Sequence, residues 1–165
     1  MKKLNKGQIF AIRTVCTDYA AWHADHVGNK GVWREEMTAI AMGDTNYAGL
    51  SRSKFSDRRA RDVLIGGRRT EVKSLRCSLD LPAGKYATVE QAVDAYFEQA
   101  TATQYVFCYN SGKRCDGGEI SIAVMLPTDA KKFMLSAFTM DAGKCRWTCG
   151  AHKLDDFLYA HGVQF

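Results

Sequence analysis

Residues 62–74 read DVLIGGRRTEVKS, and this stretch holds the strongest signal for the fold. The glycine pair 66–67 separates DVLI from RRTEVKSL, and two glycines between such runs predict a tight β-hairpin. Alternate side chains of a strand point to one face, so Glu71 and Lys73 share a face while Val72 points to the other. An acid and a base buried together destabilise a fold unless partners, a metal or a function compensates. The hairpin therefore raises the question of what Glu71 and Lys73 do.

The bulk composition is that of one globular domain spanning residues 1–165. Hydrophobic residues make up 46% of the chain and charged residues 25%, which is ordinary for such a domain. A run of about 18 apolar residues is missing, which excludes a membrane-spanning helix. The opening MKKLNKGQIFAIRTV lacks the apolar stretch of a signal peptide. We therefore expect a cytoplasmic protein whose six cysteines are reduced thiols.

Positive charge is concentrated around the hairpin. Residues 52–76 hold nine basic and three acidic side chains, a net charge of +6, whereas the whole chain carries +5. Concentrated positive charge favours a polyanionic partner, above all a nucleic acid. A solvated basic face with no such partner is the alternative.

The rest of the chain predicts a mixed α/β domain with one central sheet flanked by helices. Thr88 and Gln91 form a capping-box pattern at the start of an apolar helical stripe. A polar stretch, 43–61, predicts a long loop. We expect helices over 5–26, 32–42, 88–100, 128–138 and 153–161, the last ending at Gly162, and further strands over 104–110 and 119–127. The apolar stripe of the helix over 88–100 is Val89, Ala92, Val93, Tyr96, Phe97 and Ala100. Pro127 and Thr128 start the next helix, and its apolar face is Ala130, Phe133, Met134, Ala137 and Phe138. In the strand over 119–127 the apolar residues alternate, namely Ile120, Ile122, Val124 and Leu126.

Asp62, Glu71 and Lys73 form the pattern D-x8-E-x-K across the predicted hairpin. This pattern resembles the signature of the PD-(D/E)xK nuclease superfamily, which includes restriction enzymes, junction resolvases and phage exonucleases. The resemblance covers a motif core of about 60–126 and implies a restriction-endonuclease-like fold. The chain departs from the family where Arg61 precedes the acid in place of proline.

The resemblance implies a Mg²⁺-dependent nuclease that hydrolyses DNA phosphodiester bonds, with Mn²⁺ able to substitute. Asp62 and Glu71 would bind the metal together with the Val72 backbone carbonyl, and Lys73 would position water or stabilise charge at the phosphate. Elementary chemistry agrees, because Mg²⁺ prefers oxygen ligands and a lysine ammonium stabilises developing negative charge. The small size favours a structure-selective or phage or mobile-element accessory nuclease, endonuclease or exonuclease. Six arginines would contact backbone phosphates: Arg58, Arg59, Arg61, Arg68, Arg69 and Arg76.

Several alternatives stay open. The same fold could bind DNA without cutting it, or its basic face could meet an acidic protein. RNA stays open beside DNA, and many superfamily members work as homodimers. The pair Glu71 and Lys73 could also lie on a surface strand in a cross-strand salt bridge, worth at most about 1 kcal/mol.

Other residue groups are weaker candidates for chemistry. Glu35 or Glu36 could add a carboxylate to the metal site, and the Gln8 side chain could face the site in the same way, although surface positions are expected for all three. His23 and His26 are too few for a metal site of their own. Four cysteines could bind zinc, but their spacing is loose and free thiols are favoured: Cys108, Cys115, Cys145 and Cys149. Three alternating aromatics are expected in the core and sheet: Tyr105, Phe107 and Tyr109.

Overall fold

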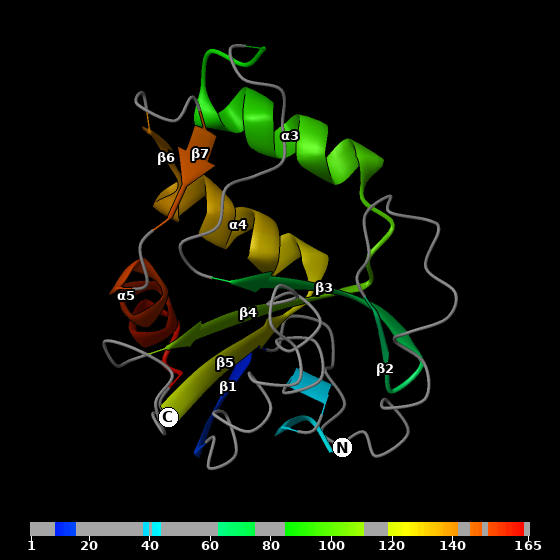
Figure 1. Cartoon of the computed structure of the whole chain (residues 1–165). Coiled ribbons are helices and arrows are strands. Elements are labelled where there is room, and N and C mark those ends of the chain that lie inside the picture. The colour runs from blue at the N-terminus through cyan, green and yellow to red at the C-terminus, as the bar shows by residue number, and fades with distance from the viewer. Residues whose placement is uncertain are drawn as a thin grey trace, which may run out of the picture.

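A computed structural model describes residues 9–15, 38–39, 41–43, 63–74, 85–110, 119–141, 146–149 and 152–163. Its elements in chain order are β1 (Phe10–Val15), β2 (Val63–Ile65), β3 (Arg68–Ser74), α3 (Val89–Gln99), β4 (Gln104–Asn110), β5 (Glu119–Met125), α4 (Pro127–Ala137), β6 (Thr139–Asp141), β7 (Arg146–Thr148) and α5 (His152–Ala160). Five strands form one sheet in the order β1-β5-β4-β3-β2, and β6 pairs with β7 in a second, small sheet. The predicted mixed α/β class is confirmed (Figure 1).

The hairpin predicted from the glycine pair is present as β2 and β3. The two strands are antiparallel, and Ile65 pairs with Arg68 across a two-residue turn. Gly66 and Gly67 have φ angles of 57° and 76°, a conformation that side chains with a Cβ rarely adopt. Glycine at both turn positions therefore allows the tight turn and fixes the register of β3.

Helix α3 carries the chain from β3 to β4, which run parallel to each other. It begins after Thr88, whose side chain accepts a hydrogen bond from the Gln91 backbone N–H at 3.3 Å. The Gln91 side chain accepts in turn from the Ala87 N–H at 3.0 Å, one residue before the position expected in a capping box. A parallel pair requires a crossover of this kind, because the chain must return to the starting end of the sheet.

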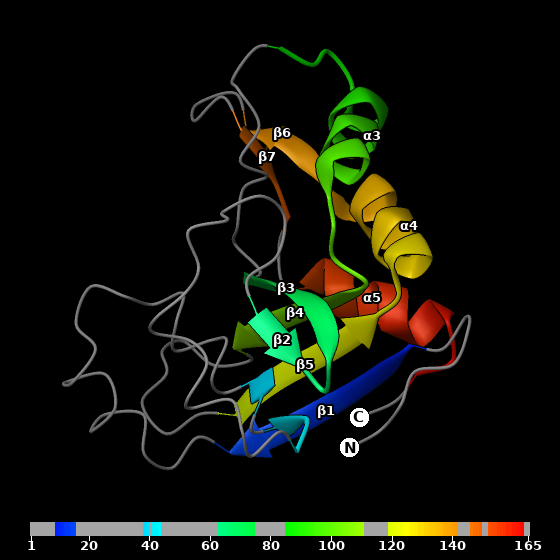
Figure 2. The ribbon, with the colours of Figure 1, turned by 90° about the vertical axis from the view of Figure 1, so that its right-hand side faces the viewer.

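Helices α3, α4 and α5 lie on the same side of the sheet, with α4 between the other two (Figures 1 and 2). The Phe133 ring of α4 lies 4.7 Å from the Phe107 ring of β4 and 5.2 Å from the Phe157 ring of α5, measured between centroids. The predicted apolar face of α4 is confirmed as core, since all five of its members are buried: Ala130, Phe133, Met134, Ala137 and Phe138. Phe107, Phe133 and Phe157 thus form a row of aromatic rings that joins β4 to α4 and α5.

Residues 122–125 of strand β5 are buried on both faces. The strand pairs antiparallel with β4 on one side and with β1 on the other. Ala123 and Met125 belong to the core cluster under the helices, and Ile122 and Val124 on the opposite face are equally inaccessible, all at 0% exposure. The predicted apolar residues at alternate positions are therefore joined by buried apolar residues between them, as in a central strand.

The helix predicted over 5–26 is wrong in its described part, because residues 10–15 form strand β1. β1 pairs antiparallel with β5, Phe10 opposite Val124 and Val15 opposite Glu119. Short apolar runs fit helical and strand periods alike, and FAIRTV is rich in aromatic and β-branched residues that favour strands. The remainder of 5–26 lies outside the described residues.

Other predictions fare differently. Within 32–42, residues 38, 39 and 41 are helical; the loop over 43–61 lies outside the described residues. The helices over 88–100, 128–138 and 153–161 are confirmed, and Gly162 follows the last with a φ of 69°. The small sheet of β6 and β7 was not predicted, because strands of three residues carry little periodic signal.

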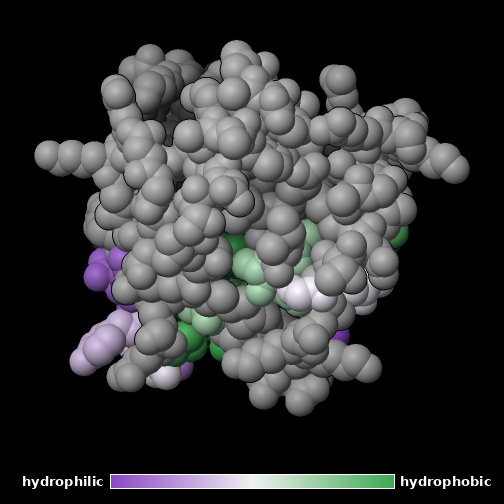
Figure 3. Space-filling model, turned by 60° about the horizontal axis from the view of Figure 1, so that its bottom comes forward, coloured by the Kyte–Doolittle hydropathy of each residue, from purple (hydrophilic) through white to green (hydrophobic). Residues whose placement is uncertain are grey.

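The surface of the described part is ordinary. Its exposed large hydrophobic side chains are Met140 and Tyr159, which lie apart in the sequence. In the face shown by Figure 3, hydrophobic residues of the described part are visible near the centre and at the lower left. No helix within the described ranges is long and apolar enough to cross a membrane.

Candidate functional site

The helix side of β3 carries charge where the neighbouring strand carries apolar groups. Glu71 is only 5% exposed and lies in register with Tyr105 of β4, a member of the core cluster. Lys73, two residues on, lies in register with Phe107. The expected sharing of a face by Glu71 and Lys73 is confirmed by their direct contact. Glu71 is buried on that face, where it meets the Tyr96 side chain of α3, so the alternative of a surface strand is wrong.

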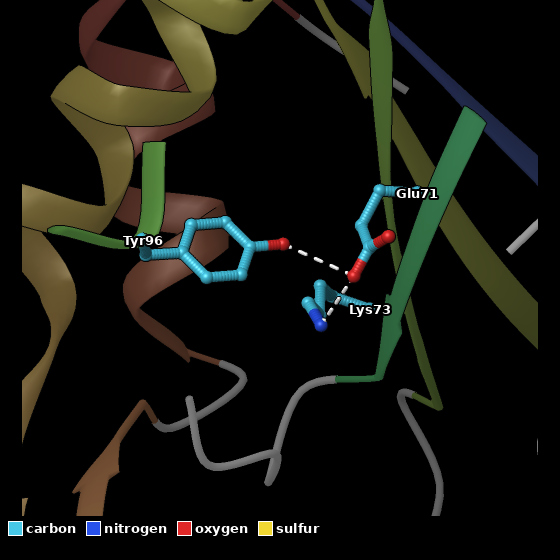
Figure 4. Close-up of polar contacts among 3 residues, drawn as sticks. All are labelled: Glu71, Lys73 and Tyr96. Atoms are coloured by element: carbon cyan, nitrogen blue, oxygen red, sulfur yellow. Dashed lines mark hydrogen bonds and ion pairs between the residues drawn. The ribbon is translucent and has the colours of Figure 1, made fainter. Parts of the chain in front are cut away.

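Glu71 is held by two neighbours through one carboxylate oxygen (Figure 4). Its Oε1 lies 2.5 Å from the Lys73 Nζ, and the Lys73 side chain is 15% exposed. The same oxygen accepts a hydrogen bond of 3.0 Å from the hydroxyl of Tyr96 on α3. The Lys73 Nζ also lies 5.3 Å from the centre of the Tyr96 ring, within the range of a cation–π interaction. The three side chains therefore form one charge-assisted contact between sheet and helix.

Tyr105 adds a second phenol to this group, and its hydroxyl is unusual. The side chain is 1% exposed, and its oxygen has no hydrogen-bond partner within the part of the chain that the structure describes. Burial raises the pKa of Tyr105, and the negative charge of Glu71 raises it further. The Tyr96 and Tyr105 ring centroids lie 6.5 Å apart. We call Glu71, Lys73, Tyr96 and Tyr105 the polar cluster.

Hydrogen bonds on the other face of β3 fix the strand that carries the polar cluster. The buried Gln104 side-chain amide donates to the Thr70 hydroxyl at 3.1 Å, and this hydroxyl donates to the Arg68 carbonyl at 3.1 Å. The Thr103 N–H donates to the Arg69 carbonyl at 2.8 Å. These bonds tie the beginning of β3 to the beginning of β4, so Glu71 has a rigid base.

Only part of the predicted site lies in the described ranges. Glu71, Val72 and Lys73 are consecutive on β3, and Arg68 and Arg69 begin the strand directly after the turn, Arg69 being exposed. The remaining predicted site residues lie outside the described residues: Asp62, Arg58, Arg59, Arg61 and Arg76. Asp62 directly precedes β2 in the sequence.

The weaker candidates divide in the same way. Tyr105 and Phe107 are buried, which confirms the prediction that they belong to the core. Cys108 and Cys149 are buried thiols. The other members of these groups lie outside the described residues, namely Gln8, His23, His26, Glu35, Glu36, Cys115 and Cys145, as does the Tyr109 side chain. Across the described ranges, no group of three or more His, Cys, Asp and Glu residues could hold a metal ion.

Sequence reasoning placed Tyr96 in the apolar stripe of α3 and missed its polar role. Its ring does pack against the core, with the Phe97 ring 5.4 Å away between centroids. Its hydroxyl reaches Glu71, a residue 25 positions earlier in the chain. A tyrosine in a stripe that otherwise consists of alanine, valine and phenylalanine was the available signal, because a buried phenol usually finds a partner.

Comparisons with known proteins add no relative. No protein-family model matches the chain, and neither a curated protein nor a solved structure shows significant similarity to it.

Proposed function

We propose that this protein is a Mg²⁺-dependent nuclease that hydrolyses DNA phosphodiester bonds. The observation that supports it is the juxtaposition of the Glu71 carboxylate and the Lys73 ammonium on a buried strand face that the fold could have filled with apolar groups. A buried ion pair by itself contributes little to the stability of a fold, because the desolvation of the two charges offsets most of their attraction. Buried charges with a lysine and a carboxylate side by side are typical of functional sites.

The oxygen chemistry of β3 suits a hard divalent cation. Lys73 and Tyr96 contact one oxygen of the Glu71 carboxylate, and the second oxygen points away from both side chains (Figure 4). In the proposed site this second oxygen would bind the cation. In the proposed site Asp62 and the Val72 carbonyl complete the protein ligands, as the resemblance to PD-(D/E)xK nucleases implies. A bound Mg²⁺ would polarise the phosphate and activate a water, and Mn²⁺ can take its place.

Lys73 would act on the reacting phosphate in this proposal. An ammonium beside a metal-bound carboxylate can orient the attacking water and stabilise the charge that develops on phosphorus oxygens. Its partial exposure of 15% leaves the side chain within reach of solvent and substrate. Glu71, which is more deeply buried, would in turn hold the metal and Lys73 in fixed relation.

DNA would be gripped by the basic residues around the hairpin. Arg68 and Arg69 follow the glycine turn, where a strand end can meet a phosphate backbone. Arg58, Arg59, Arg61 and Arg76 belong to the same basic window of the sequence and complete the proposed contact surface. RNA in place of DNA is an outcome that the experiment below can distinguish.

DNA binding without cleavage is the second candidate function. It is favoured by the contacts of Glu71 itself, because Oε1 already accepts from Tyr96 and pairs with Lys73. A carboxylate satisfied by protein partners can serve as a purely structural element of a binding domain.

The test is a panel of labelled linear and branched DNA and RNA substrates, incubated first with Ca²⁺ and then with Mg²⁺ or Mn²⁺. We expect binding with Ca²⁺ and cleavage with Mg²⁺ or Mn²⁺. Lys73→Met should lower the cleavage rate by about 100–1,000-fold, since charge stabilisation acts mainly in the transition state. Lys153→Met, which removes an exposed lysine from α5, is the matched control and should cut like wild type.

Each outcome assigns one function. Binding with no cleavage under any divalent ion would favour the second candidate. Neither binding nor cleavage would leave an interaction with an acidic protein as the remaining use of the basic surface. Rates are compared well below the melting temperature of each variant, so that loss of fold does not imitate loss of chemistry.

A further inference from the structure

The two oxygens of the Glu71 carboxylate have different surroundings. Oε1 is fixed by two donors, the Tyr96 hydroxyl at 3.0 Å and the Lys73 Nζ at 2.5 Å. The other oxygen points away from both of them, toward the opposite side of the carboxylate (Figure 4). The two donors therefore hold the plane of the carboxylate, because one fixed oxygen determines where the second one points.

The Tyr96 hydroxyl is itself held firmly in place. Its ring lies on α3 in contact with the core, with the Phe97 and Tyr105 ring centroids 5.4 and 6.5 Å away. Helix α3 is joined to α4 by packing and by an ion pair of 2.8 Å between Asp94 and Lys131. The hydroxyl thus approaches Glu71 from a rigid helix, unlike the flexible ammonium of Lys73, which has four rotatable bonds.

We propose that Tyr96 is a positioning residue of the metal site, which orients Glu71 so that its second oxygen is presented to the divalent cation. This inference rests on the proposed function. Carboxylates that bind metals are usually hydrogen-bonded themselves, and loss of such a supporting contact lowers metal affinity by about 10–100-fold. Tyr96 would touch neither the metal nor the substrate.

The direct test measures binding of Mn²⁺ without DNA, through the electron paramagnetic resonance signal of the free ion. Tyr96→Phe keeps the ring and its packing and removes only the hydroxyl. We expect its Mn²⁺ affinity to fall by about 10–100-fold. Tyr159→Phe removes a hydroxyl from a side chain that is 80% exposed on α5, and it should bind Mn²⁺ like wild type. Glu71→Gln should bind none at this site.

A second readout separates positioning from general damage. The half-saturating Mg²⁺ concentration for DNA cleavage should rise in Tyr96→Phe by the same factor as the Mn²⁺ dissociation constant. At saturating Mg²⁺ the cleavage rate should return to that of wild type. A variant that had merely lost part of its fold would cut more slowly at every Mg²⁺ concentration.

A third readout needs no substitution at Tyr96. In wild-type protein with ¹³C-labelled tyrosine rings, adding Mg²⁺ should shift the assigned Tyr96 ring resonance, because its hydrogen-bond acceptor becomes a metal ligand. The same addition to Glu71→Gln should leave that resonance in place.

The outcomes are distinguishable. If wild type binds Mn²⁺ and Glu71→Gln does not, but Tyr96→Phe binds as tightly as wild type, the positioning role is overturned and the proposed nuclease stands. An unchanged Tyr96 resonance in Mg²⁺-bound wild type would overturn it in the same way. If wild type binds no Mn²⁺ at all, the proposed function fails and the inference fails with it.

Discussion

Strands β3 and β4 lie side by side and face the same helices, yet they meet them with opposite chemistry. From β4, Tyr105 and Phe107 enter the apolar core. From β3, the residues in register with them are Glu71 and Lys73. The β4 side is explained by burial of apolar surface, whereas the β3 side needs compensating contacts to exist at all.

The difference shows that at β3 the fold keeps a less stable, charged arrangement in place of apolar packing. Apolar residues in place of Glu71 and Lys73 would extend the surface that Phe107 and Phe133 already form. The chain instead keeps an ion pair there and supports it with the Tyr96 hydroxyl. Departures of this kind from a well-packed core are expected where a protein performs its function.

The largest effect is expected on the β4 side. Phe133→Ala removes the ring that joins β4 to α5, and we expect it to lower the free energy of unfolding by about 3–5 kcal/mol. Chemical denaturation followed by circular dichroism measures this loss. Tyr159→Ala, at an exposed position of α5, should change it by less than about 0.5 kcal/mol. Equal losses in the two variants would contradict the proposed division between core and surface.

A smaller effect is expected on the β3 side, and it should depend on the partner. Glu71→Gln and Lys73→Met each remove one member of the ion pair, so each should lower the free energy of unfolding. The double variant should lose less than the sum of the two, with a coupling of about 0.5–3 kcal/mol. A double-mutant cycle from denaturant titrations measures this coupling. Strictly additive losses would mean that the ion pair does not act as a unit in the folded protein.

The smallest effect is expected at Tyr105, which belongs to the apolar core and lies in register with Glu71. Tyr105→Phe removes a buried hydroxyl that has no hydrogen-bond partner in the described part of the chain, and keeps the ring in the core. We expect a gain of about 1 kcal/mol at neutral pH, because the desolvation penalty of an unpaired hydroxyl is relieved. A loss in this variant would show that the hydroxyl has a stabilising contact in solution.

The same variant should alter the response to alkali. Burial, with the charge of Glu71, raises the pKa of Tyr105 in the folded protein, whereas in the unfolded chain it ionises near its ordinary pKa of about 10. Above that pH the unfolded state binds fewer protons than the folded state, so stability falls as pH rises. Unfolding titrations at several pH values should show a steeper alkaline loss in wild type than in Tyr105→Phe.

Sequence reasoning was most successful where local chemistry alone decides the structure. The glycine turn at 66–67, the cap at Thr88 and the proline at the start of α4 each fix a backbone conformation within a few residues. It failed at residues 10–15, where the outcome depends on a partner strand far along the chain. Periodicity cannot reveal that β5 pairs with this segment.

The site was predictable in part for the same reason. Alternation on one strand placed Glu71 and Lys73 on a common face, and the structure has them in contact. Nothing local could show that this face would be buried and in contact with α3, because the Tyr96 side chain that meets Glu71 lies 25 positions later in the chain. The hydrogen bond from Tyr96 to Glu71 joins residues far apart in the sequence, so the role of the Tyr96 hydroxyl could not be predicted from the helical stripe alone.

The pairing of β1 with β5 has a consequence for the order of events during synthesis. Ala11 lies opposite Ala123, so β1 leaves the ribosome roughly 110 residues before the strand with which it pairs. At the usual speed of translation this delay is about 5–20 s, during which an unpaired strand can associate with other chains. β1 therefore reaches its partner only after β2, β3 and β4 have been made, and the five-stranded sheet is completed only when β5 has emerged.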